Sequence, residues 1–293
     1  MGYILLIFSA LLLSFNFAVT KFYQKRYGNT LKTGLIFNVV SGVIVSLAFS
    51  PFIRISHFGE WFSPAMVVIQ TVFVVVYTLI GFKLMSRGTV ALYTMSLMAG
   101  GMLVPYFFGI AFLNERVNVI NVIGVILILA AVILMNAGQE NLNKTNIFLL
   151  VCVFLINGGT SIVTKIHQIS PLATFETLEF IWLSGVSRAV LSAVILPFTK
   201  SEVALSKQAQ KISLKTVLIF ILPIVLSVGL DKLAMGLQLI GAKTAPATMM
   251  FPIISGGTVA FTAIVSFLIY KEKLSKKSVF AIITCLIGTF LFV

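Results

Sequence analysis

The 293-residue chain is poor in acidic residues, cysteine and histidine. Asp and Glu number only 8, and all charged residues together make up 10% of the chain, against about a quarter in an average soluble domain. A water-soluble single domain is therefore excluded. Two cysteines and two histidines are too few for a disulfide framework or for a zinc cluster of the usual spacing. We expect neither a metal nor a cofactor.

Basic residues outnumber the acidic ones, and the 21 Lys and Arg give a formal net charge of +13. These cations are too scattered to form a phosphate-binding face, so we expect no nucleic-acid partner. Apart from Arg188 and Lys232, 15 of them follow odd-numbered apolar segments and 4 follow even-numbered ones. The positive-inside rule then places both termini outside the cell.

Hydrophobic residues make up 59% of the chain and gather into long runs. A membrane-spanning helix needs about 20 mostly apolar residues. Because backbone groups in hydrocarbon must be paired internally, runs of this length predict helices and not barrel strands. The fold class is thus all-α, a polytopic membrane protein in a lipid bilayer, expected in the plasma membrane of a bacterial cell. The ten predicted helices cover residues 3 to 20, 31 to 53, 62 to 83, 89 to 113, 118 to 136, 146 to 165, 175 to 198, 214 to 239, 245 to 270 and 277 to 293.

Three short motifs occur twice in the same order, at offsets of 144 to 157 residues. An odd number of helices separates the copies, so the second half would enter the membrane from the opposite side, as in many secondary transporters. We predict two five-helix inverted-topology repeats, residues 1–138 and 146–293, joined by the connector 139–145. The paired motifs are Val19 to Gln24 with Val163 to Gln168, Gly100-Gly101 with Gly256-Gly257, and Asn114-Glu115-Arg116 with Lys271-Glu272-Lys273.

The stretch 114–117, Asn-Glu-Arg-Val, leads into the aliphatic run 120–132. Together they resemble the glutamate-containing turn and closing helix of each half of EamA-type members of the drug/metabolite transporter superfamily. The second copy, 271–274 followed by 282–293, is similar but has Ala281 opposite Gly124. The resemblance covers the full chain. It implies a secondary carrier that moves small organic solutes by alternating access, and it implies both termini inside the cell, opposite to the charge count.

Polar residues recur on single faces of eight predicted helices, which indicates a polar cavity between them. The helices at 118–136 and 277–293 are aliphatic almost all round, so we expect them at the periphery, against lipid or in a homodimer contact. For any single hydroxyl the alternative is a bond to the carbonyl four residues earlier. The residues predicted to contact a small-molecule solute are Arg188, Asp231, Asn157, Ser161, Asn16, Tyr77, Ser255, Gln238 and Trp182.

Arg188 and Asp231 lie inside apolar helices, where a charge costs about 2.5 to 3.5 kcal/mol. We expect them to pair with each other or to bind the solute, with Arg188 on an anionic group and Asp231 as the proton site if transport is proton-coupled. Lys232 lies about 100° round the helix from Asp231, so we do not expect the two to face one another.

Gly100, Gly101, Gly256 and Gly257 are predicted to allow close helix packing, with 89–113 meeting 245–270. His57 and His167 fall in predicted connectors. The chain lacks HExxH, GxSxG and Gly-rich phosphate-loop motifs, so we expect no enzyme activity. The sequence predicts an exporter of a small metabolite such as an amino acid. The alternatives are an importer or exchanger of a phosphorylated or nucleotide-linked solute, and a non-transporting membrane scaffold.

Overall fold

A computed structural model describes residues 2–53, 59–87, 90–112, 118–137, 144–199, 214–242, 247–271 and 274–291. Within these residues the chain is all-α, with ten α-helices and two short 3-10 turns, η1 (Ser50–Phe52) and η3 (Leu196–Phe198). The α-helices are α1 (Gly2–Tyr27), α2 (Leu31–Phe49), α3 (Phe62–Arg87), α4 (Val90–Phe112), α5 (Val119–Ala137), α6 (Lys144–Ile169), α7 (Thr177–Ile195), α8 (Leu214–Ala242), α9 (Ala247–Tyr270) and α10 (Lys276–Phe290).

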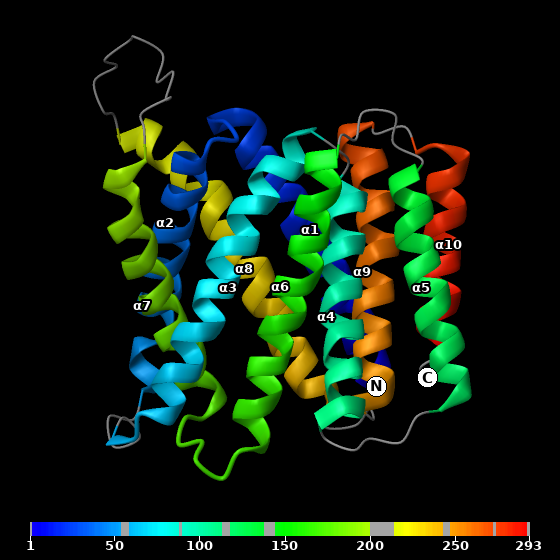
Figure 1. Cartoon of the computed structure of the whole chain (residues 1–293). Coiled ribbons are helices and arrows are strands. Elements are labelled where there is room, and N and C mark those ends of the chain that lie inside the picture. Colours follow the sequence, from blue (N-terminus) through cyan, green and yellow to red (C-terminus); the bar gives the residue numbers. More distant parts are fainter. Residues whose placement is uncertain are drawn as a thin grey trace.

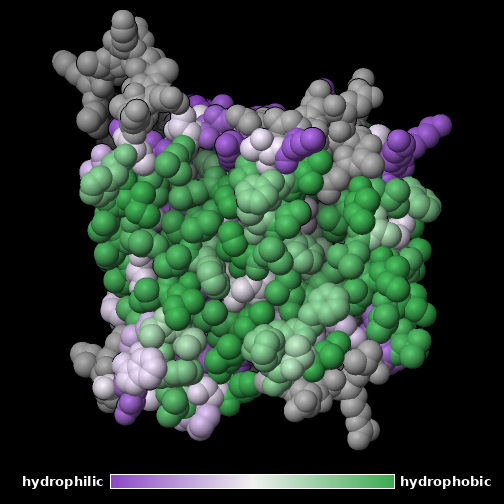
Figure 2. Space-filling model, viewed as in Figure 1, coloured by the Kyte–Doolittle hydropathy of each residue, from purple (hydrophilic) through white to green (hydrophobic). Residues whose placement is uncertain are grey.

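Eight of the described helices are long and apolar enough to cross a membrane. Large hydrophobic side chains cover the outer surface between two polar ends, which Figure 2 shows as a green band. The chain is therefore a multi-pass membrane protein, as its composition predicts. Of the other two helices, α5 has its described apolar stretch at Val119–Leu134, and α10 has 15 described residues.

Helix starts follow from local capping. Thr30 begins α2, where its Oγ1 accepts a hydrogen bond of 3.2 Å from the amide of Thr33. Glu176 caps α7, and Glu179 returns the bond by accepting from the Glu176 amide at 2.8 Å. This reciprocal capping box pairs two amides that the helix leaves free. The two glutamates therefore define the start of α7.

The helices run side by side between the two polar ends (Figure 1). The first helix α1 packs against α8 and α9, while α6 packs against α3 and α4. The pair α2 and α7 and the pair α5 and α10 are also in contact. The α5 and α10 pair lies at one edge of the bundle and presents many exposed aliphatic side chains. Both termini lie at the same end of the molecule.

Charge is distributed unequally between the two ends. At the end without the termini, which we call the basic end, the helix ends and connectors carry nine Lys or Arg whose side chains the structure describes, and purple residues gather there in Figure 2. The end with the termini, here the terminal end, carries Lys165 and three glutamates among the described residues. The basic-end cations are Lys21, Lys25, Arg26, Lys32, Lys83, Lys144, Lys271, Lys276 and Lys277.

The four glycines predicted to allow close packing all lie at close helix contacts, but the glycines of α4 do not contact those of α9. A Cβ on Gly100 would lie 2.0 Å from the Phe154 carbonyl oxygen, so only glycine lets α4 approach α6 so closely. Gly101 faces Asn157 of α6, Gly256 faces Thr289 of α10, and Gly257 faces Ala10 of α1. Although α4 and α9 do contact each other, these glycines face other helices.

Candidate functional site

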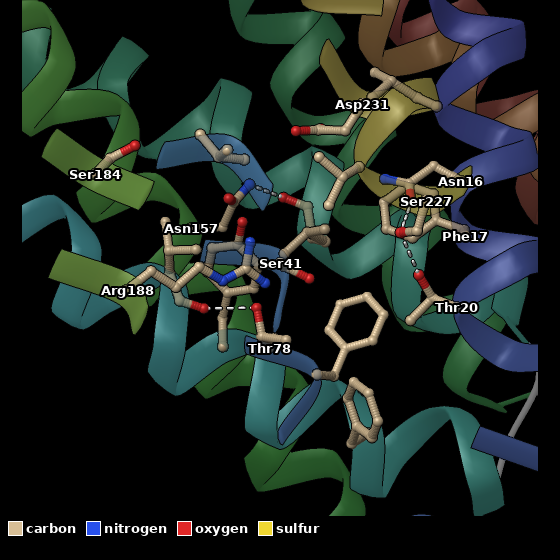
Figure 3. A pocket seen from close by; sticks show the side chains of 18 of the residues that line it. Asn16, Phe17, Thr20, Ser41, Thr78, Asn157, Ser184, Arg188, Ser227 and Asp231 are labelled. Carbon is tan, nitrogen blue, oxygen red and sulfur yellow. Dashed lines mark hydrogen bonds between the residues drawn. The ribbon is translucent and has the colours of Figure 1, made fainter. Parts of the chain in front are cut away.

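A cavity of about 300 Å³ lies in the middle of the bundle. Its described lining residues come from α1, α2, α3, α4, α6, α7 and α8, and Figure 3 shows several of them pointing into the shared space. The expectation that α9 also lines this cavity is wrong for the described residues of α9. That helix packs against α1 and α4, which themselves line the cavity. The polar lining residues are Asn16, Thr20, Ser41, Gln70, Thr71, Tyr77, Thr78, Tyr93, Asn157, Ser184, Arg188, Ser227, Asp231 and Lys232.

Arg188 extends from α7 into the cavity and is held by α2. Its Nε and Nη2 both donate to Oδ1 of Asn38, at 3.0 and 2.6 Å. Asn38 is fully buried and neutral, so this contact fixes the guanidinium without cancelling its charge. The expected pairing of Arg188 with Asp231 is wrong, because α2 and not α8 supplies the neighbour that Arg188 reaches.

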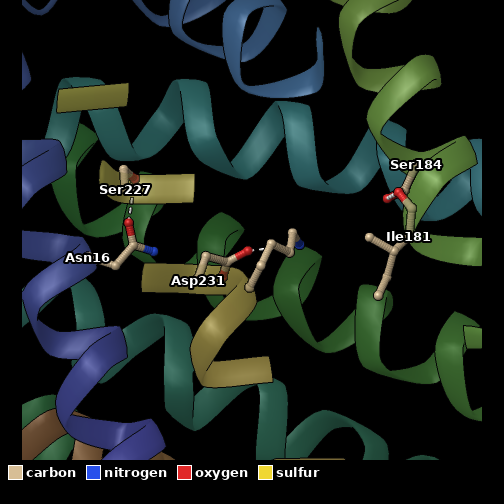
Figure 4. A network of polar contacts seen from close by, with 6 residues as sticks. Asn16, Ile181, Ser184, Ser227 and Asp231 are labelled. Carbon is tan, nitrogen blue, oxygen red and sulfur yellow. Dashed lines mark hydrogen bonds and ion pairs between the residues drawn. The ribbon is translucent and has the colours of Figure 1, made fainter. Parts of the chain in front are cut away.

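Asp231 forms its ion pair with the next residue. Lys232 Nζ lies 2.9 Å from Asp231 Oδ2, and the two side chains are 26% and 43% exposed, respectively (Figure 4). The expectation that these residues do not face each other is therefore wrong. Their Cβ atoms diverge by about 100° around the helix, but the four-carbon stem of lysine is long enough to bring its ammonium back.

Asn16 belongs to a polar bridge between α1 and α8. The Ser227 hydroxyl donates to Asn16 Oδ1, and the Thr20 hydroxyl lies 3.3 Å from Ser227 Oγ (Figures 3 and 4). Because the Ser227 proton is directed at Asn16, Thr20 is the donor in the second bond. The three side chains link two cavity-lining helices that are distant in sequence.

Asn157 and Tyr77 also line the cavity, from α6 and α3. Asn157 Nδ2 donates to the Leu97 carbonyl at 2.7 Å, which ties α6 to α4. Two further lining hydroxyls, on Ser41 and Thr71, are buried and have no hydrogen-bond partner within the described residues. Buried polar groups are normally paired, so these two hydroxyls are exceptions in the cavity lining.

Thr71 and Thr78 line the cavity without having been predicted, although their seven-residue spacing places both on one face of α3. Four of the predicted residues do not line the cavity. Ser161 lies on α6 and bonds weakly to the Asn157 carbonyl at 3.4 Å. Ser255 borders a separate void of about 10 Å³ between α4, α5, α9 and α10. Gln238 and Trp182 are partly buried on α8 and α7, outside the lining.

Aromatic rings lie toward both ends of the bundle. At the basic end, Phe37 and Phe82 line the cavity and pack with Tyr23, at ring-centroid distances of 5.1 and 6.1 Å. Tyr27 and Phe220 complete this aromatic cluster from α1 and α8. Rings from four helices thus pack between the cavity and the basic end.

At the terminal end, a buried network surrounds Ser63 of α3. His167 Nε2 lies 3.0 Å from Ser63 Oγ, which also accepts from the amides of Thr174 and Phe175 at 2.9 and 3.3 Å. His167 is in the last turn of α6, not in a connector, and its ring packs on Phe180 at 4.9 Å. The network joins α3, α6 and the segment before α7.

The two turns that carry the resemblance to EamA-type transporters lie largely outside the described residues, including Glu115 and Glu272. Among the residues that the structure describes, no three His, Cys, Asp or Glu side chains are grouped so that they could hold a metal ion.

No family model and no curated protein matches this chain. Its fold is nevertheless shared with a solved structure described only as "Crystal structure of protein", at a TM-score of 0.55 and 13% identity. The match covers 99% of this chain and 96% of the other. At this identity the likeness extends to the fold alone: an all-α chain of ten helices, eight of them long enough to span a membrane.

Proposed function

We propose that this chain is a secondary transporter, an exporter of a small organic metabolite with one anionic group, such as an amino acid. The observation that carries the proposal is the central cavity, into which Arg188 brings a positive charge that its neutral partner Asn38 does not cancel. A membrane scaffold has no need of such a charge, which is costly to keep among apolar helices.

The helix contacts support an inverted repeat of residues 1–138 and 146–293. Exchanging the proposed halves turns the contacts of α1 with α8 and α9 into those of α6 with α3 and α4, and both sets are present. The α2·α7 and α5·α10 pairs map onto themselves. A two-fold relation between the halves accounts for this pattern, and repeats of this kind underlie alternating access in many carriers.

The ring clusters at the two ends support the same proposal. Tyr23 and His167 hold matching positions in the repeated motif, offset by 144 residues. Tyr23 packs on Phe37 of α2, and His167 packs on Phe180 of α7. In an alternating-access carrier, matched clusters would close the cavity first at one end and then at the other.

Cavity charge favours a solute with one anionic group over a phosphorylated or nucleotide-linked solute. The charged side chains among its described lining are Arg188, Lys232 and Asp231, which leave a net charge of one. A phosphate ester carries close to two negative charges at neutral pH. A single carboxylate on the solute matches the net charge of this cavity.

The direct test is flux in proteoliposomes, with a panel of labelled amino acids, organic acids and sugar phosphates. We expect flux of at least one small anionic or zwitterionic solute above that of protein-free vesicles. Arg188→Lys should lower it by about ten-fold, because the charge remains but the forked donors that hold Asn38 and a carboxylate are lost. Lys276→Gln, which removes an exposed cation at the start of α10, is the control and should leave flux unchanged.

Absence of flux for every solute in the panel, together with no solute-dependent thermal shift, would favour a scaffold. If protons drive transport, Asp231 is the proposed coupling site, and Asp231→Asn should remove the dependence on a pH gradient. Full gradient-driven flux in that variant would refute this assignment.

A further inference from the structure

The ion pair of Asp231 and Lys232 differs in kind from the anchoring of Arg188. Arg188 is held across two helices by two donors on one acceptor, at 3.0 and 2.6 Å. Lys232 reaches Asp231 from the adjacent position on the same helix, through a single contact of 2.9 Å. Arg188 is thus fixed in place, whereas Lys232 is attached only by its own flexible stem.

The carboxylate of Asp231 is satisfied from within α8. No described ion pair joins it to any other helix, although it lines the cavity together with Arg188 (Figure 3). Both members of the pair are partly exposed, so water in the cavity can solvate each of them when they separate. An exposed pair of this kind contributes little binding free energy, and another cation can replace the lysine at little cost.

We propose that Lys232 is a tethered counter-cation, which the ammonium group of the solute replaces at Asp231 while Arg188 takes the solute carboxylate. The solute is then a zwitterion, an α-amino acid or a similar amino carboxylate. This inference rests on the proposed transport function and names both the chemical class of the solute and a residue that sets its affinity.

The charge count is consistent with this exchange. In the cavity Arg188 has a neutral hydrogen-bond partner, Asn38, and Asp231 is ion-paired with Lys232. A zwitterionic solute places its carboxylate on Arg188 and its ammonium group on Asp231. The ammonium of Lys232 is released and moves into water.

The wild-type protein allows a first test that needs no substitution. The labelled amino acid with the highest flux in proteoliposomes is competed with two analogues, one lacking only the amino group and one lacking only the carboxylate. We expect each analogue to compete at least about ten-fold more weakly than the unlabelled parent, a step of about 1.4 kcal/mol. Equal competition by the deaminated analogue would overturn the inference.

Two substitutions of Lys232 are expected to change the KM for the amino acid in opposite directions. Lys232→Met keeps the length of the side chain but removes the competing cation, so the KM for the amino acid should fall by about two- to five-fold. Lys232→Arg offers a fork of donors to Asp231 and competes more strongly, so the KM should rise. The affinity for the deaminated analogue should be the same in both variants, since it does not use Asp231.

Shifts of KM in the same direction for both variants, or equal shifts for the amino acid and its deaminated analogue, would overturn the role of Lys232. Flux of other solutes without flux of any amino acid would overturn the inference but leave the transport proposal standing. Absence of flux for all solutes would overturn both.

Discussion

At the scale of single residues, Arg188 shows how a charge is accommodated among apolar helices. Its insertion costs about 2.5 to 3.5 kcal/mol when the charge is unpartnered. The guanidinium is stabilised by hydrogen bonds to the buried side-chain amide of Asn38 in α2 and by the polar cavity, and not by a carboxylate. Arg188 therefore keeps an uncancelled charge for a ligand, at the expense of leaving Asn38 Nδ2 buried without a partner in the described residues.

Asn38→Asp separates stability from function at this position. The new carboxylate has the same size, replaces the unpartnered Nδ2 with an acceptor and gives Arg188 a charged partner. We expect the melting temperature in detergent to stay the same or rise, while flux falls by at least about ten-fold because the anion site is neutralised. Asn118→Asp, at the exposed start of α5, is the control; flux at the wild-type rate in Asn38→Asp would contradict the role of Arg188.

Ser63 is expected to stabilise the terminal end of the bundle through its hydrogen bonds. Its hydroxyl accepts from two amides and contacts His167, and Ser63, His167 and Phe175 are buried. Ser63→Ala removes the shared partner of these bonds, and a buried group that loses its partner costs about 1 to 3 kcal/mol. We expect a clear fall in melting temperature, whereas Ser50→Ala at an exposed position should have little effect. Equal melting temperatures for the two variants would show that the network does not stabilise the terminal end.

At the scale of helices, glycine determines which pairs can cross closely. Gly42 of α2 and Gly185 of α7 face each other, and a Cβ on Gly42 would lie 2.5 Å from the Gly185 carbonyl oxygen. This crossing also sets the distance between Asn38 and Arg188, which lie about one helical turn away on the same two helices. The anchoring of Arg188 thus depends on a small residue at the crossing.

Gly42→Ala should therefore separate α2 from α7 and loosen the contact between Asn38 and Arg188. Overpacking of this kind typically costs about 1 to 3 kcal/mol, so we expect a lower melting temperature and a weaker response to anionic solutes. Gly229→Ala is the matched control, because a Cβ there meets no atom within 4 Å. If both variants melted at the same temperature, the close crossing would not be a source of stability.

At the scale of the whole molecule, the distribution of charge predicts orientation. Among the side chains that the structure describes, nine cations lie at the basic end, whereas Lys165 lies with three glutamates at the terminal end. By the positive-inside rule the basic end faces the cytoplasm and both termini face outward. A reporter that is active only in the cytoplasm should be inactive when fused after Val293 and active when inserted between residues 200 and 213. Activity at the C-terminus would reverse this orientation and agree with the family resemblance.

The sequence by itself determined the class of fold. Long apolar runs and the scarcity of charge allow only helices in a bilayer, because each run satisfies its own backbone hydrogen bonds. Helix positions follow from the same local property, and most predicted boundaries lie within a few residues of the described ones. Periodicity also placed Asn16, Asn157, Tyr77, Arg188 and Asp231 on polar faces, and all five line the cavity.

Only the tertiary structure decided which side chains meet. The partners of Arg188 and Asp231 depend on which helices are neighbours and on how far each side chain reaches, and neither property is local in sequence. The same reason explains Ser255, which lies on a polar face of α9 but borders a different void. The helical period gives the direction in which a side chain points from the axis of its helix. The packing of that helix against the others decides whether the side chain then faces the cavity.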